Sequence, residues 1–200
     1  MHDHIEFVKA QKNIDISNHD LPGPGNPVNT EPVEVVLEYP LGKGLDEGRA
    51  MLQIVHDIAP KAKLAFRTGF ISAGDFAEGI VALQEDSCDV IVDDVTYITE
   101  PFFQDGIVSQ AVNYVRDQGV SYFTSAGNFG NTSYEGVFNA MQAPAGVIGR
   151  AHDFGGGDYL QKISLKKGAY TLVLQWDDSI YSMKQLPGAR NDYDVYLTDI

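Results

Sequence analysis

The sequence predicts an α/β fold, in which a parallel sheet is flanked by helices, followed by the start of an antiparallel β module. Strand-like and helix-like segments alternate between about residues 34 and 124. The segment Cys88–Val95 is a nearly continuous apolar run, which is typical of a strand covered on both faces. After about residue 152 the helical patterns stop and strand-like runs continue. Alternation followed by such runs predicts a parallel sheet with helical crossovers and then an all-β segment.

The alternating region opens with a predicted strand over Val33–Tyr39 and a predicted helix over Asp46–Ala59. A second strand covers Lys63–Arg67. The next helix is opened by Ser72, with Asp75 three residues later, an approximate capping box. These local signals predict two strand–helix units before the buried strand.

A further helix is predicted over Asp105–Gln118, after that strand. Its apolar residues recur along one stripe: Ile107, Val108, Ala111, Val112 and Val115. Gly119 ends the helix, because glycine readily adopts the left-handed backbone of a helix C-terminus. The run Val120–Thr124 is the fourth predicted strand.

The pattern divides the chain into three regions. Residues 1–33 include a stretch rich in Pro, Gly and Asn and are predicted to be a loop or linker. Residues 34–152 form the predicted α/β domain, and residues 153–200 form the start of the β module. Because the few predicted strands of this module cannot close a sandwich, we expect the sequence to be truncated on its C-terminal side.

Composition excludes several classes of function. The chain has 200 residues, of which 44% are hydrophobic and 21% charged, as in ordinary globular proteins. Its formal net charge of -14, with 14 Lys and Arg, argues against nucleic acid and anionic membranes as partners. No apolar run approaches the roughly 20 residues that span a bilayer, and the first residues lack a signal-peptide pattern. The single cysteine, Cys88, excludes an internal disulfide and is predicted to be a buried small hydrophobe.

Glu47 occupies an unexpected position on the helix over Asp46–Ala59. A helical projection places it on the apolar stripe with Met51, Ile54, Val55 and Ile58, and it places Arg49, Gln53, His56 and Asp57 on the opposite side. A buried carboxylate is costly, so Glu47 is a functional-site candidate. The alternative is an acid that complements the helix N-terminal dipole. His56 is predicted to be a surface residue, and the histidines have no zinc-ligand spacing.

Two segments, Thr124–Gly130 and Asp46–Pro60, carry a family resemblance. Over roughly residues 34 to 135 the chain resembles the subtilisin-like serine peptidases, or subtilases. In that family the corresponding helix begins with His-Gly-Thr, and the His is the general base. The resemblance therefore implies that Glu47 is the base, as the Glu of the related sedolisins is, although their second acid corresponds to Met51 here. It also implies that the Asn128 amide lies in the oxyanion hole, the alternative being a left-handed turn residue.

The same resemblance implies a substrate cleft. Asp94 is the candidate second acid, with the alternative that it only ends a strand or binds a helix N-terminus. The substrate-binding candidates are Val95, Thr96, Tyr97, Ser125, Ala126 and Gly127. The family's Gly-Thr-Ser nucleophile motif does not occur in this sequence, and Ile14–Ser17 is only a weak imitation of the catalytic-Asp motif. We therefore expect this chain not to hydrolyse peptides by itself.

The resemblance implies a fragment of a secreted serine endopeptidase that acts on peptide or protein substrates. The alternative is a non-catalytic subtilase-like module that binds peptides or proteins. A dinucleotide-binding sheet is a distant third, because no strand leads into Gly-x-Gly-x-x-Gly. The segment Asn191–Leu197 resembles an Asp-rich strand of the jelly-roll-like domains that accompany many secreted peptidases. No cofactor or metal is predicted. Calcium would fit the acidic composition of the chain and the family resemblance, but the sequence shows no recognisable set of calcium ligands.

Overall fold

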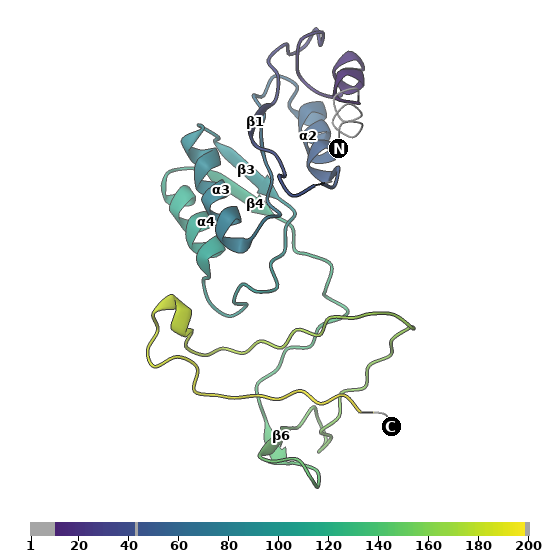
Figure 1. The fold of residues 1–200 in the computed structure, drawn as a ribbon, viewed down its shortest axis with the longest axis vertical. Coiled ribbons are helices and arrows are strands. Elements are labelled where there is room, and N and C mark those ends of the chain that lie inside the picture. The colour runs from purple at the N-terminus through teal and green to yellow at the C-terminus, as the bar shows by residue number, and fades with distance from the viewer. Residues whose placement is uncertain (1–10, 43, 199–200) are drawn as a thin grey trace. The chain divides into compact units, whose positions relative to one another are not determined.

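The computed structural model describes residues 11–42 and 44–198, and strands alternate with helices in the predicted order (Figure 1). The elements up to residue 124 are β1 (Glu34–Leu37), α2 (Glu47–Ile58), β2 (Ala65–Arg67), α3 (Ala73–Glu85), β3 (Val90–Asp93), α4 (Ile107–Asp117) and β4 (Ser121–Thr124). Each element coincides with a predicted segment. The mixed α/β class with parallel strands is therefore confirmed.

The predicted helix ends are confirmed by backbone geometry. The Oγ atom of Ser72 accepts a hydrogen bond from the backbone N–H of Asp75 at 3.1 Å, which caps α3. After α4, Gly119 has a φ of +94°, a conformation that favours glycine. Residue types at helix ends thus gave reliable boundaries.

The strands form separate parallel pairs instead of one continuous sheet. β1 pairs with β2, and β3 pairs with β4 in a register that runs from Val90 opposite Ser121 to Asp93 opposite Thr124. Both pairs are parallel, so the carboxyl ends of β3 and β4 lie at the same edge. Ligand sites of open α/β sheets lie at this edge.

The hydrophobic core lies between α3, α4 and one face of the β3–β4 pair (Figure 1). Its buried side chains are Phe76, Ile80, Ile91, Ala111, Val115 and Val120. Cys88 is half-buried at the margin of this core, and burial raises the pKa of its thiol. On the opposite face of the strand pair, Val90 and Phe123 are 59% and 60% exposed. The described residues therefore cover one face of this apolar run, and coverage of its second face stays a prediction.

A partly buried ion pair links β2 to α3. The Arg67 guanidinium donates to both carboxylate oxygens of Asp75 at 2.9 Å. The two side chains are 8% and 21% exposed. Gly79 makes room for this arrangement, because a Cβ there would lie 2.7 Å from Arg67 Cδ. The hydrogen bonds from Arg67 lower the pKa of Asp75.

The N-terminal segment, residues 11–33, packs along α2. Residues 11–17 are helical and the remainder is irregular, as predicted for a loop. The segment nevertheless buries Asp15, Ile16, Leu21 and Asn26. It also bonds the chain beyond α2, where Asn29 Nδ2 donates to the carbonyl of Ala62 at 3.0 Å. It therefore packs as part of the fold and is not an extended linker.

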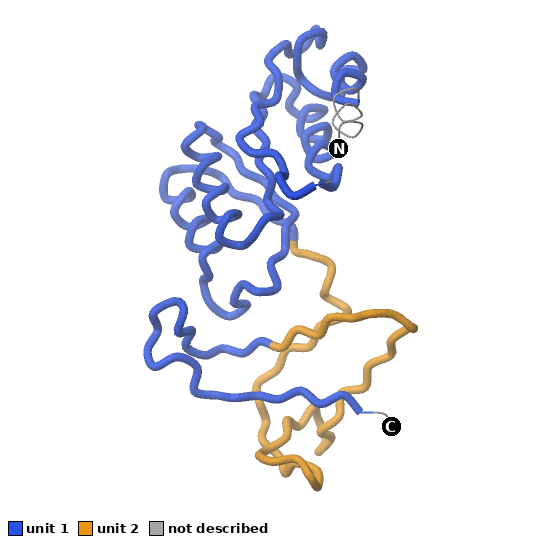
Figure 2. The backbone as a smooth tube through the Cα atoms, viewed as in Figure 1, with its two compact units in different colours: residues 1–125, 175–200 blue, residues 126–174 orange. Residues whose placement is uncertain are grey.

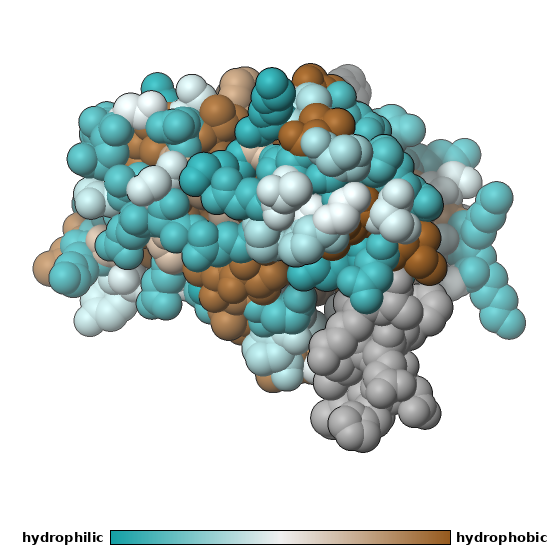
Figure 3. All heavy atoms as spheres, turned by 90° about the horizontal axis from the view of Figure 1, so that it is seen from above, coloured by the Kyte–Doolittle hydropathy of each residue, from teal (hydrophilic) through white to brown (hydrophobic). Residues whose placement is uncertain are grey.

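The predicted buried face of α2 is wrong. Glu47 is exposed, and Ile54 and Ile58 are 60% and 81% exposed, whereas His56 is only 2% exposed. The physical reason is that the N-terminal segment covers the side of α2 that carries His56. Seen from above, hydrophobic side chains interrupt the hydrophilic surface in patches (Figure 3).

The described chain divides into two units (Figure 2). The first runs to Ser125 and resumes at Gln175; the second is Ala126–Leu174. In the second unit, β5 (Ala140–Gln142) and β6 (Arg150–His152) form an antiparallel pair. Within β6, His152 contacts the rings of Tyr134, Phe138 and Phe154.

The predicted antiparallel strands after residue 152 are not formed within residues 153–198, where the assigned element is η1 (Tyr181–Met183). Apolar residues of these runs are accordingly exposed, Leu172 by 54% and Val195 by 58%. Isolated strands are marginal in water unless further strands or a helix cover their apolar face. The β-sandwich therefore stays a prediction.

Two sequence expectations concern membranes and the N-terminus. Among the described residues, no helix has both the length and the apolar character that a membrane span requires. The segment Met1–Glu6, for which the sequence gives no signal-peptide pattern, lies outside the described residues. His2 and His4 lie outside them as well.

Candidate functional site

The predicted general base, Glu47, lies in the first turn of α2. Beside it, Gly48 packs on the ring of Phe66 from β2, where a Cβ would lie 2.5 Å from Phe66 Cε2. This close approach holds the start of α2 against the strand pair. It therefore sets the position from which Glu47 reaches solvent. Because Glu47 is exposed, burial does not support a functional role for it. The alternative, that its carboxylate complements the helix N-terminal dipole, stays a prediction.

An ion-pair network flanks Glu47. The Arg49 guanidinium binds the carboxylates of Asp46 and Asp15. Its hydrogen bond lowers the pKa of Asp46. Asp15 is the acid in the weak imitation of the family's catalytic-Asp motif. It is 3% exposed, and its carboxylate accepts a hydrogen bond from Arg49. The network anchors the N-terminal segment beside the first turn of α2.

Gly48→Ala is expected to lower the free energy of unfolding by about 1–2 kcal/mol. Overpacking against Phe66 costs about 1–3 kcal/mol, and the better helix propensity of alanine returns up to about 1 kcal/mol. The measurement is urea unfolding followed by circular dichroism. Gly74→Ala in α3 is the matched control, because the nearest atom to its Cβ would be Ser72 Oγ at 3.9 Å. Equal effects of the two substitutions would contradict the packing argument.

The carboxyl edge of β3–β4 carries a hydrogen-bonded carboxylate, Asp93. Its Oδ2 accepts from the hydroxyl of Tyr122 at 2.6 Å. Its Oδ1 accepts from Thr124 Oγ1 at 2.9 Å and from the backbone N–H of Val95 at 3.0 Å. Burial, followed by the hydrogen bond to Asp93, raises the pKa of Tyr122. All the donors are neutral, so the Asp93 carboxylate is held in place without a cation.

Sequence reasoning singled out Asp94 and did not choose Asp93. The signal that could have found Asp93 is the period of two in a strand. Ile91 is buried on the face covered by α3 and α4, so Asp93 lies on that same face, and Asp94, which is exposed, follows on the other. The catalytic role of Asp94 stays a prediction.

A cavity of about 330 Å³ opens beside Asp93, against α3 and α4. Its polar lining consists of Asp93, Asp105, Ser109, Asn113, Tyr122 and Thr124, and its apolar lining of Phe76, Val95, Val108 and Val112. Asn113 Nδ2 donates to Asp105 at 2.9 Å on its α4 side. Apolar walls with a few convergent polar groups are typical of binding sites.

The other predicted substrate-binding residues are distributed around this edge. Val95 lines the cavity. The Tyr97 hydroxyl donates to the carbonyl of Gly69 at 2.6 Å, which fixes the segment after β3. Thr96 is exposed, and Ser125 follows Thr124 directly. Ala126, Gly127 and Asn128 belong to the second unit, so their geometry relative to Glu47 stays a prediction.

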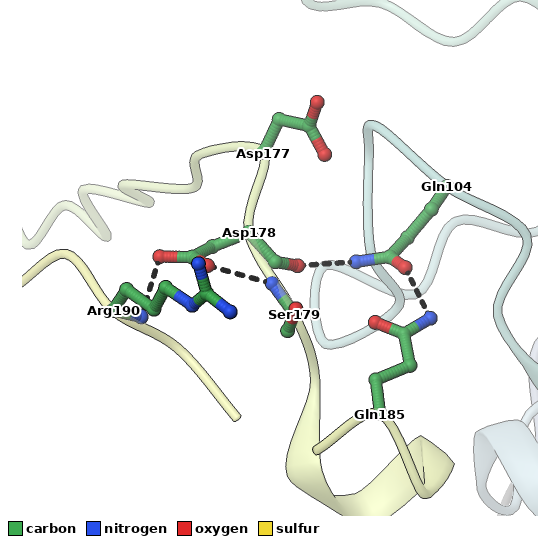
Figure 4. A pocket seen from close by; sticks show the side chains of 6 residues that line it. All are labelled: Gln104, Asp177, Asp178, Ser179, Gln185 and Arg190. Carbon is green, nitrogen blue, oxygen red and sulfur yellow. Dashed lines mark hydrogen bonds between the residues drawn. The ribbon is translucent and has the colours of Figure 1, made fainter. Parts of the chain in front are cut away.

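A second cavity, of about 430 Å³, lies between residue 104 and the segment 177–190 (Figure 4). Gln104 donates to the carbonyl of Asp178 and accepts from Gln185, both at 2.7 Å. Backbone N–H groups of Asn191, Ser179 and Arg190 lower the pKa of Asp178 to about 2. These polar groups already hydrogen-bond to one another. We therefore interpret the cavity as part of the contact that holds the C-terminal segment in place, and not as a ligand site.

The described residues offer no cluster of three or more His, Cys, Asp or Glu side chains that could hold a metal ion. The candidate site is therefore built from the start of α2 and from the cavity at the carboxyl edge of β3–β4. Together, fold and site define a mixed α/β protein with a cavity of mixed polar and apolar lining at the edge of a parallel strand pair. Comparison of the chain with known protein families, curated proteins and solved structures gives no match.

Proposed function

We propose that this chain contributes the substrate cleft, the general base and an oxyanion-hole donor to a secreted subtilisin-like serine endopeptidase. The observation that carries the proposal is the register of β3–β4. Asp93 lies opposite Thr124, so the segment Asp94–Tyr97 and Ser125 leave the same edge of a parallel pair. An extended peptide would bind between these two neighbouring segments. The catalytic groups are assigned from the sequence motifs.

Each proposed catalytic group has a defined role. Glu47 accepts the proton of the serine nucleophile, which lies outside these residues. Asp94 is the second acid, because two neighbouring carboxyls split their pKa values and one of them keeps a proton. The Asn128 amide donates to the oxyanion of the tetrahedral intermediate. In the first unit the proposed peptide-binding residues are Val95, Thr96, Tyr97 and Ser125; Ala126 and Gly127, which belong to the second unit, are assigned to substrate binding from the sequence alone.

The finer architecture belongs to the same proposal. The two parallel pairs are parts of a subtilisin-like sheet, and residues 153–200 begin a jelly-roll-like sandwich. Exposed apolar side chains on β3 and β4 support this view, since parallel sheets are normally covered on both faces. Further strands would likewise cover the apolar runs after residue 152.

The test is labelling with a fluorophosphonate, which reacts with activated serine nucleophiles. The protein that joins this chain to its downstream sequence is expected to be labelled and to hydrolyse an unstructured protein such as casein. The 200-residue chain alone is the control and is expected to do neither. Absence of labelling and hydrolysis in the longer protein would overturn the peptidase assignment.

The second candidate function is a non-catalytic module that binds peptides or proteins. It is favoured by the exposure of Glu47 and by the cavity beside Asp93, which this chain forms without further sequence. Under this alternative, the longer protein binds an extended peptide at the β3–β4 edge but is not labelled. Fluorescence anisotropy with labelled casein peptides would show that binding.

A further inference from the structure

His56 forms a buried polar contact between α2 and the N-terminal segment. Its side chain is 2% exposed, and that of its partner Asn26 is 0% exposed. The two side chains meet at 3.0 Å between His56 Nε2 and Asn26 Nδ2. Leu21 and Pro22 are buried in the same part of the segment. The contact therefore closes a small core that is separate from the one beneath α3 and α4.

The hydrogen bonds of Asn26 determine which ring nitrogen carries the proton. Asn26 Oδ1 accepts from the backbone N–H groups of Val28 at 2.9 Å and Asn29 at 3.4 Å. Its Nδ2 donates to the carbonyl of Leu21 at 3.0 Å. The amide orientation is thus set, and Nδ2 must also donate to His56. His56 Nε2 is therefore the acceptor, and in the neutral ring the proton lies on Nδ1.

The site offers nothing to compensate a charged ring. His56 Nδ1 is buried and has no hydrogen-bond partner among the described residues. The nearest ion pair on that face of α2 is Arg49 with Asp15, about two turns before His56. The remaining titratable groups of the segment, of α2 and of the following turn are Lys12, His19, Asp20, Glu31, Asp46, Glu47, Asp57, Lys61 and Lys63. Of these, Glu31 and Lys63 pair with each other at 3.0 Å.

We propose that His56 is an acid-sensitive latch that holds the N-terminal segment on α2. Protonation places an N–H on Nε2, where it faces the N–H of Asn26, and it buries a positive charge without a counter-ion. Histidine is the side chain that ordinarily changes charge between about pH 5 and 8. On mild acidification the segment around Asn26 leaves α2 and exposes Leu21. At neutral pH the contact closes again.

Hydrogen exchange measured by mass spectrometry tests the latch in the full 200-residue chain. Between about pH 7.5 and about pH 5.5, protection of residues 18–30, corrected for intrinsic exchange, is expected to fall at least about tenfold. Protection of α4 is expected to stay constant. In His56→Gln, the side-chain oxygen still accepts from Asn26 but does not titrate, so the change should disappear. An equal loss in His56→Gln, or no loss in the natural chain, overturns the latch.

Two further measurements remain decisive even if His56→Gln fails to fold. Asn26→Asp replaces the donor by a carboxylate, which pairs with the charged ring, so acidification should then protect residues 18–30. A loss of protection in Asn26→Asp as large as in the natural chain contradicts the mechanism. In the natural chain, nitrogen chemical shifts at neutral pH should show the proton of His56 on Nδ1. A proton on Nε2 would also overturn the proposal.

Discussion

Glu47→Gln is expected to lower kcat for peptide hydrolysis by about 10²–10⁴-fold in the protein that joins this chain to the nucleophilic Ser, the range typical of losing a general base. Glutamine preserves the shape of the side chain but accepts no proton. The change should fall on kcat and leave KM nearly unaltered, because the group acts in the chemical step. The measurement is steady-state hydrolysis of a chromogenic peptide across a range of pH.

The control for this experiment is Glu85→Gln, which removes an exposed carboxylate from α3. It should leave kcat unchanged. The alternative role of Glu47, complementing the helix dipole, is worth about 0.3–1 kcal/mol of stability and nothing in catalysis. A Glu47→Gln enzyme with near-normal kcat and slightly lower stability would therefore assign Glu47 to the dipole.

Asp75→Ala is expected to lower the free energy of unfolding of the 200-residue chain by about 1–3 kcal/mol, the range for losing hydrogen bonds to a charged group that is only partly buried. The substitution leaves the Arg67 guanidinium, whose side chain is 8% exposed, without its carboxylate. The measurement is urea unfolding followed by circular dichroism at neutral pH.

Two controls separate this effect from a loss of surface charge. Glu78→Ala removes an exposed acid from the same helix and should change the free energy of unfolding by no more than about 0.5 kcal/mol. Replacing both partners, Arg67→Met with Asp75→Leu, should cost less than Asp75→Ala alone, since no buried charge is left unpaired. A loss below about 1 kcal/mol for Asp75→Ala would show that the pair contributes little.

The same ion pair gives a pH dependence with a defined sign. The pKa of Asp75 is lower in the folded chain than in the unfolded chain, because Arg67 hydrogen-bonds the carboxylate. The stabilisation is therefore fully present at pH values above the pKa of Asp75 in the unfolded chain, which is about 4. It is lost as the pH falls through the lower folded value. Asp75→Ala should lack this component of acid destabilisation, whereas Glu78→Ala should retain it.

The candidate site was predicted from sequence only in part. The position of Glu47 at the start of α2 and the edge location of Asp94 and Val95 follow from local patterns. The prediction that Glu47 is buried is wrong. Sequence reasoning also did not select Asp93, although strand periodicity places it on the same face as Ile91. Both errors concern the side to which a residue points, which depends on the neighbouring element and not on the local pattern alone.

The sequence by itself determined the order and boundaries of the strands and helices, because periodicity, the Ser72 cap and Gly119 act over a few neighbouring residues. Tertiary structure decided which faces are buried. Packing of residues 11–33 turned His56 from an expected surface residue into a buried one and left Ile58 exposed. It also decided that the strands β1 to β4 form two separate parallel pairs. A helix or strand carries its own period, but only contact with a distant segment removes a given face from water.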